Sequence, residues 1–172
     1  VNLPAAQKMA EPRYQELEPE QIPEETHEDG TVVRVIAGRT AQGTTGPVTE
    51  ITASPLFLDV TLNAGTEYRE QLGDEHNAFI YQIEGSITVM DGEGGKQNIP
   101  EKHLAVLGKG TTVHIQADET SRFLLIAGRP IGEPIFRHGP FVMNTSEEID
   151  QAYRDYSNGL FGRIEEQTDA VA

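Results

Sequence analysis

The chain has 172 residues, a formal net charge of −15 and no cysteine, and 37% of its residues are hydrophobic. This length suits one domain with an extension, and the negative charge argues against direct binding to nucleic acid or to an anionic membrane. Without cysteine, disulfides, zinc–thiolate sites and thiol nucleophiles are excluded. No apolar run approaches the ~20 residues of a membrane span and no signal-peptide pattern starts the chain, so we expect a cytoplasmic location. Because the chain starts at Val1 rather than Met, we expect a fragment or a processed product.

Residues 1–30 are expected to form an extended linker or arm. They are rich in proline and glutamate, and proline interrupts both helices and sheet ladders. His27 lies in this acidic arm, where we expect it to be solvated. Apolar residues at regular intervals should anchor the arm along a surface: Leu3, Met9, Tyr14, Leu17 and Ile22.

Residues 31–163 are expected to form a β-domain. From residue 31 the sequence alternates between apolar and polar residues and is rich in β-branched side chains, and turn signals separate the alternating runs. Several short strands spaced in this way are typical of a sandwich or a barrel. The expected strands are 31–37, 56–62, 79–83, 86–90, 103–107, 111–116 and 122–127.

One C-terminal α-helix is expected over about residues 146–158. Thr145 and Glu148 have the spacing of a capping box, and Asn158 with Gly159 supplies a stop signal. The polar residues 164–172 are expected to form a frayed tail. Apolar residues with helical spacing form a single stripe along this helix: Ile149, Ala152, Tyr153 and Tyr156.

The hairpin around Gly85 resembles that of the cupins, small jelly-roll barrels that often hold a metal ion. The first cupin motif places two His and one Glu before the turn glycine, and the second places one His three residues after a Gly. Such nitrogen and oxygen donors suit Fe, Mn, Ni or Cu. Counted from Gly85 and Gly110, the four ligand positions fall on Gln71, Gly73, Ala78 and Val113.

None of these four positions carries a His or an acidic residue, so we expect no metal and no catalytic residue in this chain. His76 lies between the expected ligand positions on a polar loop. His114 is one residue away from Val113, and a shift of one residue on a strand turns a side chain to the other face.

The chain also resembles the pirin family. Residues 1–9 and 11–17 resemble the pirin linker, and residues 79–85, 105–108, 125–128, 132–135 and 139–145 resemble its C-terminal domain. Pirins are similar to bicupins, and three His and one Glu of their N-terminal domain bind iron or a related metal. The family is associated with quercetin 2,3-dioxygenase activity and, in some members, with a role as a transcriptional cofactor.

The resemblance implies an all-β, cupin-type jelly roll with an N-terminal arm and one C-terminal helix. It also implies that the N-terminal cupin domain, with its iron or other divalent metal, is the missing partner of this chain. A docking face left open by that domain would be apolar, so we expect self-association into a homo-oligomer.

Three functions are compatible with these observations. The first is a metal-free, structural cupin half of a pirin-like dioxygenase. The second is a protein-interaction module of a transcriptional cofactor, which would use the acidic arm and the apolar residues Phe141, Val142 and Met143. The third is a metal-free cupin that binds a sugar or a flavonoid through Gln71, Tyr81 or Gln82, although the sequence does not define its ligand-binding residues.

Overall fold

The computed structural model describes residues 2–11, 14–48 and 52–161. The expected frayed tail lies outside the described residues. The chain divides into two compact units, which are described separately: Leu17–Pro130, here called the β unit, and Val1–Glu16 with Ile131–Ala172, here called the helix unit. No helix in the described parts of the chain is both long enough and apolar enough to cross a bilayer.

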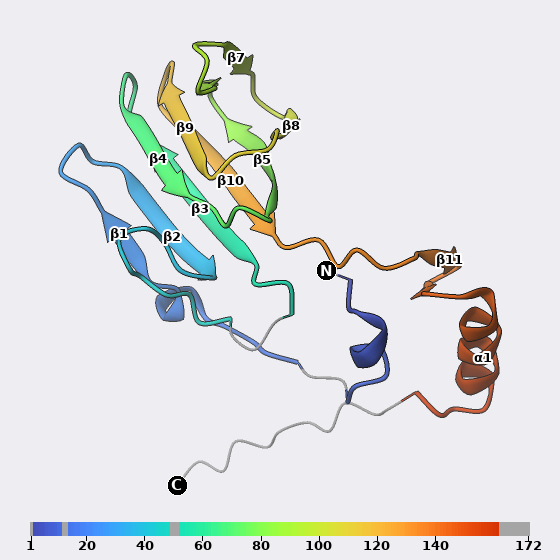
Figure 1. The fold of residues 1–172 in the computed structure, drawn as a ribbon. Coiled ribbons are helices and arrows are strands. Elements are labelled where there is room, and N and C mark those ends of the chain that lie inside the picture. Colours follow the sequence, from blue (N-terminus) through green and yellow to red (C-terminus); the bar gives the residue numbers. More distant parts are fainter. Residues whose placement is uncertain (1, 12–13, 49–51, 162–172) are drawn as a thin grey trace, which may run out of the picture. The chain divides into compact units, whose positions relative to one another are not determined.

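The β unit contains two antiparallel sheets, and Figure 1 shows β4 and β9 of one sheet lying over β3 and β10 of the other. The strand order is β1-β2-β3-β10-β5-β8 in the six-stranded sheet and β4-β9-β6-β7 in the four-stranded sheet. The first sheet contains β1 (Glu24–Thr26), β2 (Val32–Ala37), β3 (Leu56–Leu62), β5 (Asn77–Glu84), β8 (Leu104–Val106) and β10 (Ser121–Gly128). The second contains β4 (Glu67–Gln71), β6 (Ile87–Met90), β7 (Lys96–Ile99) and β9 (Thr112–Ala117).

A single hydrophobic core joins the two sheets. Along β3 and β10 every second side chain is buried, because successive residues of a strand point to opposite faces. Fully burying a side chain such as Phe123 or Leu58 stabilises the fold by roughly 1.5–3 kcal/mol. Ile80 and Leu125 of the first sheet meet Ile87 and Ile115 of the second in this core, and all four are fully buried. These features confirm the predicted jelly-roll fold.

The segment predicted to be an extended arm is more ordered than expected. Ala5–Gln7 and Pro19–Gln21 form short 3-10 helices. Glu24–Thr26 forms β1, which pairs with β2 at the edge of the six-stranded sheet.

Besides the short 3-10 helix Ala5–Gln7, the described part of the helix unit contains a hairpin and one α-helix. Strands β11 (Phe136–His138) and β12 (Phe141–Met143) pair across Gly139 and Pro140, and Gly139 adopts a φ of +55° in the turn. Neither strand was among those expected from the sequence, and Gly139 and Pro140 occupy the turn between them.

Helix α1 (Ser146–Ser157) begins with the predicted capping box. The Thr145 hydroxyl accepts a hydrogen bond from the Glu148 N–H at 3.2 Å, and a Glu148 carboxylate oxygen accepts one from the Thr145 N–H at 2.9 Å. Met143 packs with Ile149 and Ala152, and Phe141 packs against this cluster. The apolar run proposed to contact another protein is thus partly buried within its own unit.

Candidate functional site

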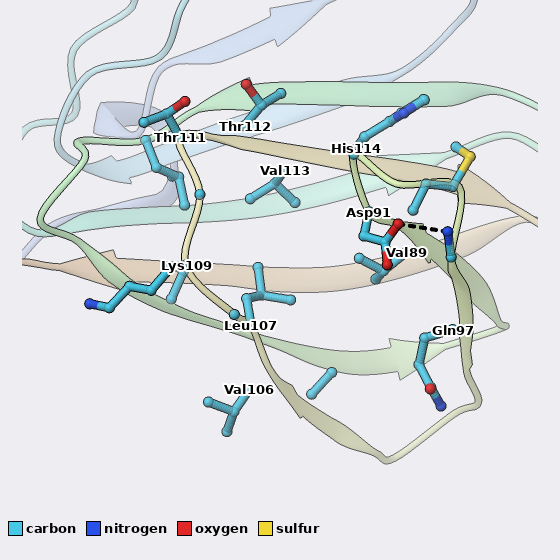
Figure 2. Close-up of a pocket in the computed structure, with 18 of the residues that line it drawn as sticks. Val89, Asp91, Gln97, Val106, Leu107, Lys109, Thr111, Thr112, Val113 and His114 are labelled. Atoms are coloured by element: carbon cyan, nitrogen blue, oxygen red, sulfur yellow. Dashed lines mark hydrogen bonds between the residues drawn. The ribbon is translucent and has the colours of Figure 1, made fainter.

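A pocket of about 660 Å³ opens into the β unit between the two sheets. Ala78 of β5 and Val113 of β9 line it from opposite sheets, and Val89 and Leu107 face the same space in Figure 2. Three loops form the rim: residues 72–76, 91–95 and 107–111. Backbone hydrogen bonds from Leu72 N–H to the Thr111 carbonyl (2.8 Å) and from Leu107 N–H to the Ala78 carbonyl (2.9 Å) hold two of these loops in place.

Two of the four cupin ligand positions lie in this pocket. Ala78 and Val113 are 6% and 4% exposed, and each presents only methyl groups. Gln71 and Gly73 do not line the pocket. The Gln71 side chain exchanges hydrogen bonds with the Thr112 hydroxyl at 3.1 and 3.3 Å, whereas Gly73 lies under the His76 ring, which a Cβ at this position would approach to 3.1 Å.

These positions do not fit a metal ion. Methyl groups offer no donor atom, and a cupin metal site uses several imidazole and carboxylate ligands. Within residues 2–11, 14–48 and 52–161, no three His, Asp or Glu side chains come together in a way that could hold an ion.

The two histidines nearest to the motif positions have different environments. His76 is half-buried in the pocket wall, and its Nδ1 is buried without a hydrogen-bond partner in the described structure. His114 also reaches the pocket, but its Nε2 lies 2.9 Å from a carboxylate oxygen of Glu67. The hydrogen bond with His114 lowers the pKa of Glu67 below its usual value, so His114 is engaged in a contact between β9 and β4.

The charged side chains around the pocket are two lysines and one aspartate. Lys96 and Lys109 lie on the rim, and the Lys109 ammonium donates to the Asn77 side chain at 3.2 Å. The Asp91 carboxylate accepts hydrogen bonds from the backbone N–H groups of Glu93 (3.0 Å) and Gly95 (2.6 Å), so it closes its own turn. The lining therefore carries a formal charge of +1 in a chain whose net charge is −15.

A second polar site, a buried cluster, lies outside this pocket and was not predicted. Glu70 of β4 is 2% exposed, and its carboxylate accepts hydrogen bonds from the Tyr68 hydroxyl (2.7 Å), the Ala41 N–H (2.8 Å) and the Gln71 N–H (3.0 Å). Burial, together with the Glu70 carboxylate, raises the pKa of Tyr68 far above its usual value. The alternation of β4 places Tyr68 and Glu70 on one face, which was the only local signal for this pair.

Glu25 of β1 belongs to the same buried region. Its carboxylate accepts a hydrogen bond from the Thr40 hydroxyl. Burial alone would raise the pKa of Glu25, but hydrogen bonds from Thr40, Thr44 and His27 lower it below its usual value. The two carboxylates of the cluster thus both accept hydrogen bonds from the loop of residues 40–44.

The expectation that His27 is solvated was wrong. Its side chain is 22% exposed, and its Nε2 lies 3.7 Å from Glu25 and 3.0 Å from the Gln42 amide. Its ring centroid lies 6.3 Å from that of Tyr68. His27 therefore covers the buried cluster because β1 carries the preceding residues into the sheet.

The residues suggested for a sugar or flavonoid site do not line the pocket. Gln82 is fully buried in the core, where its Nε2 donates to the Glu84 carbonyl at 2.7 Å and its Oε1 has no partner in the described structure. Tyr81 is 38% exposed on the opposite face of β5. Neither of them, nor Gln71, is among the residues that enclose the pocket.

Comparison with known proteins identifies the fold and the family. Residues 57–162 match the family model of the pirin C-terminal cupin domain. A pirin-like protein of Caulobacter vibrioides is 44% identical over 94% of this chain, and human pirin is 42% identical over 94%. The crystal structure of quercetin 2,3-dioxygenase from Acinetobacter baumannii superposes with a TM-score of 0.83 and 34% identity over 96% of this chain.

The chain spans about half the length of these proteins: 56% of the Caulobacter relative, 55% of human pirin and 56% of the Acinetobacter chain. The part it matches is the part that the family model describes as C-terminal. The chain therefore belongs to the pirin family and contains its C-terminal cupin domain.

Proposed function

We propose that this chain is the metal-free, structural cupin half of a pirin-like protein. The observation that carries the proposal is the replacement of the motif positions: Ala78 and Val113 place methyl groups in the pocket, while Gln71 and Gly73 lie outside it. Methyl groups cannot bind a metal, and their burial instead contributes to the core. The role of such a domain is to fold and to support a second domain.

We further propose that the complete protein has a metal-dependent activity like that of the quercetin 2,3-dioxygenase from Acinetobacter baumannii. The support is the similarity to that protein along 96% of this chain. The metal, iron or another divalent ion, would belong to the part of the protein that lies beyond this chain.

Measurements of oxygen consumption test whether the activity requires the part of the protein beyond this chain. The chain is supplied with quercetin and with Fe(II), Mn(II), Ni(II) or Cu(II), and each reaction is compared with the same metal without protein. We expect no consumption above the metal blank, whereas the longer protein with the same metals should consume oxygen. Multiple turnovers by the 172-residue chain would contradict the proposal.

The outer face of the six-stranded sheet supports a docking role. The strand register aligns one apolar row across β3, β10, β5 and β8, namely Phe57, Ile126, Phe79 and Val106. A second apolar row, Leu124, Tyr81 and Leu104, crosses β10, β5 and β8 only, because its position on β3 is Asp59, which pairs with Arg122. Val106 is 79% exposed, Leu104 56% and Tyr81 38%. Interfaces between domains of one chain bury roughly 600–1,500 Å², and an apolar face of this kind favours association.

We propose that this face contacts the other domain of the complete protein and that, without that domain, it joins two copies of the chain. Sedimentation analysis should therefore find a dimer at tens of micromolar. Substituting Leu104→Glu and Val106→Glu together should yield monomers, because each places a charge in the apolar face. Thr120→Glu, an exposed substitution in the β9–β10 turn, is the matched control and should remain dimeric. A monomeric unmodified chain would contradict the docking proposal.

A further inference from the structure

The pocket between the two sheets is built to accept an apolar body. Its floor consists of the buried residues Ala78, Ile99 and Val113, and Val89 and Leu107 complete the apolar wall. Figure 2 shows Val89, Leu107 and Val113 around the middle of the space. The volume of about 660 Å³ lies within the roughly 300–1,000 Å³ typical of small-molecule sites, which are mostly apolar with a few polar groups.

The polar groups at the mouth favour an anion over a cation. Lys96 and Lys109 are exposed on the rim, and the one acidic side chain of the lining, Asp91, is engaged by two backbone N–H groups. A cation would have to approach two ammonium groups, whereas an anion would find them free of a competing carboxylate partner on the rim. The charge of the pocket lining is therefore positive, whereas the net charge of the chain is −15.

His76 forms part of the pocket wall. Its Nδ1 is buried and has no partner in the described structure, although buried polar atoms are normally paired. Gly73 leaves room for the imidazole against the loop, since a Cβ at this position would lie only 3.1 Å from the ring.

We propose that this pocket binds a small organic monoanion with an apolar, ring-sized body, such as an aromatic carboxylate. The ring lies against Ala78, Val89 and Val113, and the carboxylate lies at the mouth near Lys96 and Lys109. Because the motif positions carry no metal-binding atoms, the cavity is apolar. The same barrel could thus bind an organic ligand in place of a metal ion.

Methyl-resolved NMR of the full 172-residue chain tests the proposal with two matched probes, 2-naphthoate and its neutral analogue 2-naphthalenemethanol. Naphthoate should shift the methyl signals of Ala78, Val89 and Val113 with a dissociation constant between about 0.1 and 1 mM, as expected for a ligand of this size. The neutral alcohol should bind about 2- to 5-fold more weakly, because partly solvated charge pairs contribute modestly.

Three variants assign the parts of the site. The double variant Lys96→Gln, Lys109→Gln should bind naphthoate only as tightly as the alcohol, and its affinity for the alcohol should be unchanged. Lys102→Gln is the control, since Lys102 is exposed, pairs with Glu101 and does not line the pocket. Ala78→Leu should abolish binding of both probes by filling the floor.

The methyl signals locate the site in the unmodified chain, so the test holds even where Ala78→Leu does not fold. The proposal is overturned if none of the three methyl signals shifts at about 10 mM naphthoate, ten times the weakest affinity expected. It is also overturned if the alcohol binds as tightly as naphthoate, or if the paired lysine variant keeps the full preference for naphthoate. The signals come from Ala78, Val89 and Val113, which are not among the residues of the proposed docking face, and they do not depend on the activity of the complete protein.

Discussion

Removing the Glu70 carboxylate should destabilise the β unit by about 2–4 kcal/mol. In Glu70→Ala the buried Tyr68 hydroxyl and the Ala41 N–H both lose their acceptor, and a buried donor without a partner costs about 1–3 kcal/mol. Removal of a buried charge offsets part of this cost. This loss is a large part of the total stability of a typical folded domain, which is 5–15 kcal/mol, with a midpoint of about 10 kcal/mol.

Two further variants separate the contributions. Glu70→Gln keeps an oxygen for the backbone donors and should cost only about 1 kcal/mol, since a neutral hydrogen bond replaces a charged one. Tyr68→Phe should cost about 1–2 kcal/mol because one donor to the buried carboxylate is lost. Combined with Glu70→Ala, the Tyr68 substitution should cost much less than alone, because the two groups share one hydrogen bond.

Urea unfolding at pH 7, followed by far-ultraviolet circular dichroism, measures these differences, since the chain has no tryptophan. The exposed Glu119→Ala is the matched control and should change the free energy of unfolding by less than about 0.5 kcal/mol. The reasoning is refuted if Glu70→Ala also stays within that range, or if Glu70→Gln is as costly as Glu70→Ala.

Other predictions follow from single contacts. The pKa of Glu25 is lower in the folded state than its ordinary value of 4.5, so its carboxylate adds stability above that pH, and this contribution is lost as the pH falls through the folded pKa. Glu25→Gln should therefore lower the urea midpoint at pH 7 more than at pH 3, and an equal loss at both would contradict this. Gly85→Ala should cost at least about 2 kcal/mol, because φ is +73° and the new Cβ would collide with the Thr120 carbonyl, whereas Gly92→Ala, with open space, should be nearly neutral in the same urea titration. Thr145→Ala should cost the helix about 1 kcal/mol and speed amide exchange in its first turn about 5-fold, and unchanged exchange would refute the capping role.

Much of the fold could be predicted because the inner faces of its main strands are apolar. The alternation along β3 and β10 is regular, and both strands were expected at nearly their observed positions. Strand β7 was missed because its sequence, KQNI, has only one buried residue. Strands β11 and β12 were missed because each has only three residues, too few for a clear alternation of apolar and polar side chains.

The candidate sites were predictable only in part. Motif spacing found Ala78 and Val113, because the distance from a turn to a strand position is local. The rim of the pocket depends on loops that are held by bonds across the sheets, such as that from Leu72 to Thr111. The inward-facing Glu70 also depends on a donor from Ala41, 29 residues earlier in the chain. Local sequence does not reveal such partners.

The metal content of the chain tests the central claim most directly. The purified chain is incubated in turn with Fe(II), Mn(II), Ni(II) and Cu(II), dialysed, and analysed by elemental mass spectrometry beside a longer pirin of known metal content. A chain without a ligand set should retain less than about 0.1 ion per molecule. One ion per molecule, retained through dialysis, would contradict the proposal that this half of the protein is metal-free.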